Sequence, residues 1–95
     1  MKITTKELKI CIDQIFNYLE DIGMKELSFK NDMYWYIPRD FRYDVYNTPK
    51  SEDLTIGQIS WDISALKKLI DKNSMPTSYH LVWLSAVLRT LGDEM

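Results

Sequence analysis

Half of the chain's aromatic side chains lie in fourteen residues, Met33-Tyr34-Trp35-Tyr36-Ile37-Pro38-Arg39-Asp40-Phe41-Arg42-Tyr43-Asp44-Val45-Tyr46. The rings alternate with charged side chains, and a single proline interrupts them. Aromatic residues favour strands, where they pack across a pleated surface. Tyr, Trp and Arg are also enriched at the energetic centres of protein interfaces. The segment therefore predicts both strands and a surface that another molecule contacts.

Two short runs predict an antiparallel hairpin that includes the start of this segment. Residues 25–29 and 33–37 are rich in side chains that favour strands, and the polar residues 30–32 between them suit a tight turn. Pro38 ends the second run, because proline lacks an amide donor and restricts the residue before it. Residues 41–46 alternate again and predict a third strand.

Alternation along the second run predicts which side chains face the core. Met33, Trp35 and Ile37 fall on one face, whereas Tyr34 and Tyr36 fall on the other. We expect the first face to cover the core. The two tyrosines are then left for a contact surface.

The most secure predicted element is a helix at the start of the chain. Residues 4–7, Thr-Thr-Lys-Glu, match the capping box, in which threonine accepts from the third helical amide and glutamate reaches back to the cap. Gly23 is the expected stop. Apolar residues between these points recur at helical spacing and predict one buried stripe. They are Leu8, Cys11, Ile12, Ile15, Leu19 and Ile22.

Two further helices are predicted after a polar loop at residues 47–53. The first begins between residues 56 and 61 and ends near Asp71, which leaves open whether Gly57 lies in a strand or in the helix. The second begins at position 77 or 78 and ends near Leu91. Apolar side chains nearly encircle it, so it is either the central core element or a half-buried one that another chain covers. Core or half-core positions are expected for Trp35, Trp61 and Trp83.

The composition is that of one folded domain. Residues 1–95 have room for a single core, and we expect an α+β domain with an N-terminal helix, an antiparallel hairpin with a third strand, and two C-terminal helices. The net charge of −2 and the scattered basic residues argue against a nucleic-acid partner. With no leader, no run long enough to span a membrane and no disulfide framework, a cytoplasmic protein without a membrane partner is expected.

No pattern in the sequence predicts a cofactor, a metal or a catalytic residue. Three separated glycines form no phosphate-binding loop, and one histidine with one cysteine is too few for a structural zinc site. Cys11 is expected to be a small buried hydrophobe. His80 is the only side chain suited to acid–base chemistry near neutral pH. It is expected to pack in neutral form against Trp83, the alternative being a general base oriented by a carboxylate.

The leading functional prediction is a non-enzymatic protein-binding domain. In size and mild acidity the chain is similar to many immunity proteins that neutralise toxins, so an immunity or antitoxin-like inhibitor is one form of this prediction. An acidic patch for a basic partner is expected from seven carboxylates. They are Glu20, Asp21, Asp40, Asp44, Glu52, Asp53 and Asp62. The expected partner-binding residues are Tyr34, Tyr36, Arg39, Asp40, Arg42, Asp44, Tyr46, Glu52 and Asp53.

Two alternatives remain open from the sequence. The first is self-association as a homodimer, through the last helix or an edge of the sheet. The second is a small enzyme that uses His80 with a carboxylate.

Overall fold

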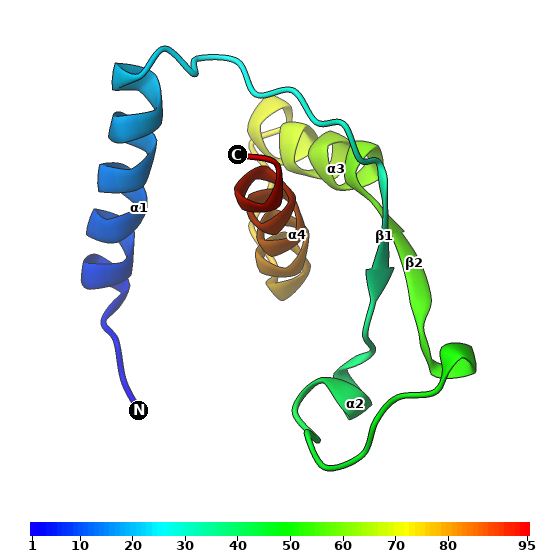
Figure 1. Ribbon diagram of the computed structural model, residues 1–95. Helices are drawn as coiled ribbons and strands as arrows, with labels where there is room; N and C mark the ends of the chain where they lie inside the picture. The colour runs from blue at the N-terminus through cyan, green and yellow to red at the C-terminus, as the bar shows by residue number, and fades with distance from the viewer.

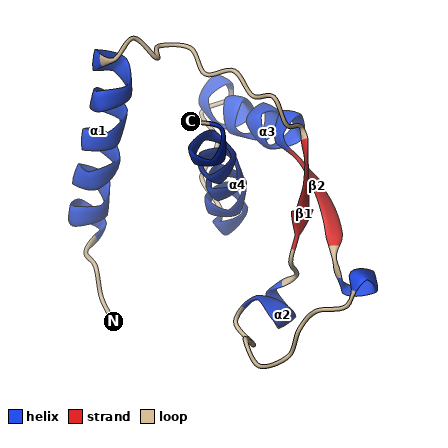
Figure 2. Cartoon of the chain, viewed as in Figure 1, coloured by secondary structure: helices blue, strands red, loops and turns tan.

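The computed structural model describes residues 1–95 and has the predicted α+β class (Figure 1). A long helix comes first, a two-stranded antiparallel ribbon follows, and two helices close the chain (Figure 2). In chain order the elements are α1 (Thr5–Asp21), β1 (Met33–Tyr36), α2 (Arg39–Arg42), the 3₁₀ turn η1 (Ser51–Asp53), β2 (Thr55–Gln58), α3 (Ile59–Asp71) and α4 (Ser78–Glu94). No helix is long and apolar enough to cross a bilayer.

The capping box predicted for α1 is confirmed. The Glu7 amide donates to Thr4 Oγ1 at 3.0 Å, and the Thr4 amide donates to Glu7 Oε1 at 3.2 Å. These two bonds satisfy amides that would otherwise have no partner in the first turn. At the other end, Gly23 adopts a φ of 89°, a left-handed conformation that glycine reaches without steric cost. Both ends of α1 therefore follow from local sequence.

The predicted partner of β1 was wrong, and no third strand forms. β1 pairs with β2, so that Tyr34 lies opposite Gly57 and Trp35 opposite Ile56. Residues 25–29 form neither helix nor strand. The amides of Lys30 and Asn31, predicted to lie in a hairpin turn, instead donate to the Glu94 carboxylate at the end of α4. The preceding run is thus held at the C-terminal end of α4 and does not pair with β1 (Figure 1).

The segment predicted as the third strand begins as a helical turn. α2 starts after Pro38, whose carbonyl accepts from the amides of Phe41 and Arg42 at 3.0 and 3.1 Å. Proline suits this position because its fixed φ is compatible with a helix start and its missing donor costs nothing there. Turns follow as far as Asn47.

The two faces of β1 are reversed relative to the prediction. Tyr34 and Tyr36 are half-buried, whereas Met33 and Trp35 are exposed, Trp35 by 67%. The reason lies in β2: Gly57 has no side chain, so the Tyr34 ring lies directly over it. Side chains two residues apart in a strand point to the same face, so Tyr36 lies on the same side as Tyr34.

The core lies where α3 and α4 pack together. Ile59 at the start of α3 and Leu91 near the end of α4 are buried there. α3 begins within the predicted window and ends at Asp71 as predicted, and Gly57 belongs to the strand before it. α4 is half-buried, with Tyr79 and Leu81 exposed at its first turns. α4 is therefore not enclosed on all sides within this chain.

Three further side chains are more exposed than predicted. Trp35 and Trp61 were expected in core or half-core positions, but Trp61 is 74% exposed. Cys11, expected to be buried, lies on the surface of α1. Only Trp83 takes the predicted half-buried position. These predictions rested on periodicity, which shows which side chains share a face but not whether another element covers that face.

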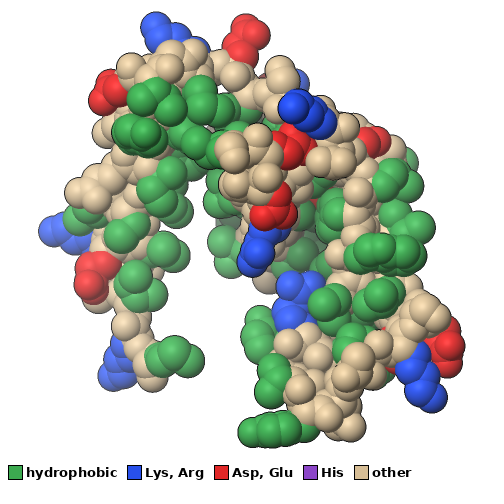
Figure 3. Space-filling model, in the orientation of Figure 1, with side chains coloured by type: hydrophobic (Ala, Val, Ile, Leu, Met, Phe, Trp, Pro, Cys, Tyr) green, Lys and Arg blue, Asp and Glu red, His purple; other side chains and the backbone are tan.

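The molecule has the shape of an open arch (Figure 3). In that view α1 forms one side, the ribbon with α2 forms the other, and a hollow bordered by hydrophobic side chains separates them. The radius of gyration is 15.3 Å, whereas a closed domain of this length has about 12 Å. The accessible surface is 8542 Å², against roughly 5,700 Å² for a closed domain of this mass.

Candidate partner-binding groove

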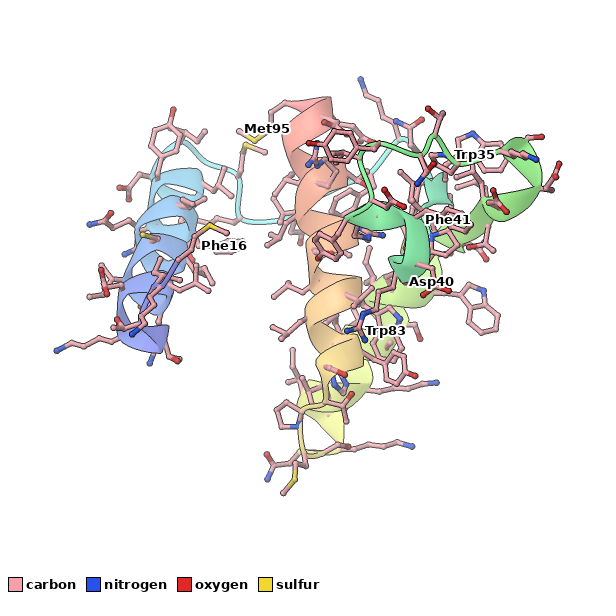
Figure 4. The ribbon with its side chains drawn as sticks, turned by 90° about the horizontal axis from the view of Figure 1, so that it is seen from below. Phe16, Trp35, Asp40, Phe41, Trp83 and Met95 are labelled. Atoms are coloured by element: carbon pink, nitrogen blue, oxygen red, sulfur yellow. The ribbon has the colours of Figure 1, made fainter.

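A groove with a volume of about 950 Å³ runs between the β1–α2 segment and α4. One wall carries aromatic and basic side chains, namely Tyr34, Tyr36, Arg39 and Arg42. The other wall is a face of α4, with Leu81, Val82, Ser85, Ala86 and Arg89. Seen from below, α2 with Asp40 and Phe41 lies beside α4, and Trp35 lies farther out on the ribbon (Figure 4). Segments far apart in the sequence therefore form one surface.

The aromatic wall is held in place by Arg42. Its Nη2 donates to the Ile37 carbonyl oxygen at 2.8 Å, and its guanidinium carbon lies 5.0 Å from the centre of the Tyr36 ring. A cation at this distance over an aromatic face is attracted by the ring's quadrupole. The hydrogen bond and the ring contact fix a long side chain before any partner arrives, which lowers the entropy lost on binding.

Tyr34 connects the groove to the interior. Its O–H donates to Asp62 Oδ2 at 2.7 Å, and Asp62 is only 6% exposed. Burial raises the pKa of Asp62, the nearby Asp32 charge raises it further, and the Tyr34 hydrogen bond opposes both. Burial and the bond to Asp62 likewise raise the pKa of Tyr34. Asp62, predicted to belong to a surface acidic patch, is therefore an internal acceptor.

The charge of the groove is basic, opposite to the predicted acidic patch. Arg39, Arg42 and Arg89 line it with one carboxylate, Asp93. The predicted acidic residues do not line it, and some have local partners. Asp44 accepts from the Asn47 side chain at 2.8 Å, and Asp53 Oδ2 accepts from the Lys50 amide at 2.9 Å. These two carboxylates stabilise turns in the segment between α2 and β2.

Four of the predicted site residues meet in the groove and five do not. The residues brought together are Tyr34, Tyr36, Arg39 and Arg42. Those outside its lining are Asp40, Asp44, Tyr46, Glu52 and Asp53. The α4 wall was not predicted from the sequence. Its signal was the last helix itself, which is apolar on most sides and has Ser85 and Arg89 on its polar edge.

His80 lines a second hollow, of about 800 Å³, between α3 and α4. Its Nδ1 accepts from the Thr77 amide at 2.9 Å, and its ring meets Trp83 edge to face at 5.2 Å. The remaining lining residues include serines, Lys68 and Trp61, and none is a carboxylate. This geometry matches the packed, hydrogen-bonded histidine of the sequence analysis. No cluster of three or more His, Cys, Asp or Glu side chains is placed to hold a metal ion.

In comparisons with models of protein families, with curated proteins and with solved structures, no match to this chain was found.

Proposed function

We propose that this chain is a non-enzymatic protein-binding domain that captures a partner in the groove between the β1–α2 segment and α4. The observation that supports the proposal is the pair of walls: Arg42 fixed over Tyr36 on one side, exposed Leu81 and Val82 on the other. Aromatic and arginine side chains are enriched at interface centres, and the exposed aliphatic side chains opposite them add apolar area that a partner can bury.

The groove's chemistry favours a partner segment with acidic and apolar side chains. Three guanidinium groups against one carboxylate give the groove a positive potential, although the whole chain carries a net charge of −2. Arginine binds carboxylates with two parallel hydrogen bonds, and a complementary charge speeds association. The immunity or antitoxin-like role is the form of this proposal that the chain's size and acidity suggest.

The test is affinity capture from the cell of origin, with quantitative mass spectrometry on what is retained. Arg89→Ala removes an exposed groove side chain with no recorded bond inside the protein, and Tyr36→Ala removes a ring from the opposite wall. Each is expected to weaken capture by about 1 kcal/mol or more, roughly fivefold in the dissociation constant. Circular dichroism checks that both variants remain folded.

The matched control is Tyr46→Ala. Tyr46 belongs to the same aromatic segment but is 95% exposed and lies outside the groove. Its replacement should leave capture unchanged. If Tyr46→Ala weakens capture as strongly as Tyr36→Ala, the binding surface is the segment between α2 and β2 and not the groove. If no protein is lost from the Arg89→Ala bait, the proposal is wrong.

A further inference from the structure

α1 is an amphipathic helix whose apolar stripe is left largely uncovered. Leu19 is buried, yet Leu8, Ile15 and Ile22 on the same stripe are 48%, 58% and 49% exposed. Figure 1 shows α1 standing away from α3 and α4, and in Figure 4 Phe16 points from α1 into the space beside α4. A helix with this pattern normally buries its stripe against another element.

The uncovered area is large enough for an obligate interface. An accessible surface of 8542 Å² exceeds that of a closed domain by roughly 2,800 Å². A standard stable interface takes about 800 Å² from each partner, and obligate homodimers take about 1,000–2,500 Å² from each. The surplus of roughly 2,800 Å² is thus more than a standard interface needs and lies just above the upper end of the range for one subunit of an obligate dimer.

The connection to the rest of the chain allows α1 to move as a unit. Residues 23–32 contain no helix or strand, and the seven of them that precede Lys30 span up to about 23 Å when extended. The far end of this tether is fixed, because the Glu94 carboxylate accepts from the Lys30 amide at 2.7 Å and from the Asn31 side chain at 3.0 Å. The link between α1 and the fixed point at Lys30 is therefore the irregular segment 23–29.

We infer that the occupant of the hollow is a second copy of this chain, and that the two copies exchange α1 helices across a two-fold axis. Each α1 then lays its stripe against the α4 side of its partner, so both stripes are covered by one repeated set of contacts. A different protein would need one surface for the α1 stripe and a second surface for the α4 side that faces it. The inference goes beyond the proposed function and does not require it, because α1 contributes no residue to the groove.

The first experiment is the mass of the full chain in solution, by sedimentation equilibrium or multi-angle light scattering. We expect twice the 11.3 kDa of one chain. Ile15→Asp places a charge on the stripe and should give the monomer, whereas Ile70→Asp, at a more exposed isoleucine on α3 (77% against 58%), should remain dimeric. A wild-type monomer throughout the accessible concentration range overturns the inference and assigns the stripe to a different protein.

The second experiment locates α1 in the dimer. Cys11, the only cysteine, belongs to the apolar stripe, so the spin label is attached instead at Asn17→Cys in a Cys11→Ser chain, an exposed position on the opposite side of α1. Labelled chains are mixed with isotope-labelled Cys11→Ser chains after unfolding and refolding together. If the helices are exchanged, the spin label on one chain should broaden the α4 resonances of the isotope-labelled partner. A dimer without such broadening contradicts the exchange.

The two proposals fail separately. Ile15→Asp should leave partner capture in the groove intact, and Arg89→Ala should leave the dimer intact. Loss of the dimer on Arg89→Ala would contradict α1 exchange, because it would place the self-contact in the groove.

Discussion

Gly57 shows how one missing side chain sets the structure of the ribbon. A Cβ at this position would meet the ring of Tyr34, its partner in the register. Because Gly57 has no side chain, the Tyr34 ring lies over β2 and its hydroxyl reaches Asp62. The inward direction of Tyr34 and Tyr36, and with it the aromatic wall of the groove, therefore depends on a glycine.

Replacing Gly57 by alanine should destabilise the protein by about 2 kcal/mol, because the new methyl group displaces a packed ring. Urea unfolding measures the change. Gly92→Ala is the matched control: nothing lies within 4 Å of its added Cβ, and it lies within α4. That substitution should stabilise by about 0.5 kcal/mol, because alanine is the better helix former. A Gly57→Ala variant as stable as the wild type would contradict the ring contact.

Removing the Tyr34 hydroxyl tests the buried pair. Tyr34→Phe leaves the Asp62 carboxylate without its donor, at a cost of about 2 kcal/mol at neutral pH. The pKa of Asp62 is raised in the folded state, so the folded protein holds this proton more tightly than the unfolded chain does. The stability that the bound proton contributes is present at low pH and is lost as pH rises through the folded-state pKa. Without the tyrosine that pKa rises further.

The deficit of Tyr34→Phe should therefore shrink when urea unfolding is repeated at successively lower pH, because Asp62 buries no charge once it is protonated. Tyr36→Phe serves as control, since the Tyr36 hydroxyl makes no recorded hydrogen bond and its ring contact with Arg42 survives. Equal deficits for Tyr34→Phe at every pH would rule out the linkage to Asp62.

Among the elements, α3 depends on a distant residue for its start. Gln58 at its N-cap makes no side-chain capping bond. Asp32, at the end of the tether, acts instead: Oδ1 accepts from the Ser60 amide at 2.8 Å, and Oδ2 accepts from the Gln58 side chain at 2.8 Å. A negative charge at a helix N-terminus also interacts favourably with the helix dipole. The same residue thus positions β1 and α3 together.

Asp32→Ala should lower the thermal midpoint, because both bonds and the favourable charge disappear. Hydrogen bonds from Gln58 and Ser60 lower the pKa of Asp32 below 3.8, so its contribution is present above that value and is lost as pH falls through the lower folded one. Asp32→Asn keeps an acceptor for Ser60 but cannot titrate. Circular dichroism melts across the acid range should show a smaller acid-induced loss for Asp32→Asn than for the wild type.

The elements also show where sequence reasoning stops. Capping residues and helical spacing predicted α1, the end of α3 and the start of α4, because these signals act within a few residues. Strand propensity located β1 but could not identify its partner. Residues 25–29 suit a strand about as well as residues 55–58 do. Two long-range contacts favour residues 55–58 as the partner of β1: Glu94 binds the Lys30 amide, and Asp32 binds the Ser60 amide just after β2.

For the molecule as a whole, the uncovered stripe of α1 predicts that stability depends on concentration. If the dimer forms, its melting temperature should rise with chain concentration, because association favours the folded state by mass action. Ile15→Asp, which is expected to be monomeric, should melt at one temperature throughout. Differential scanning calorimetry over a wide concentration range makes the comparison, and a constant wild-type midpoint would contradict self-association.

The sequence by itself determined the three long helices, the capping box of α1, the α+β class and four of the residues that line the groove. Only the tertiary structure decided the pairing of β1 with β2, the reversal of the aromatic faces and the joining of α4 to the aromatic wall. The physical reason is range. Caps and periodicity act between neighbours along the chain, whereas Tyr34 over Gly57, Asp32 at α3 and Glu94 at Lys30 join residues that meet only after the chain has folded.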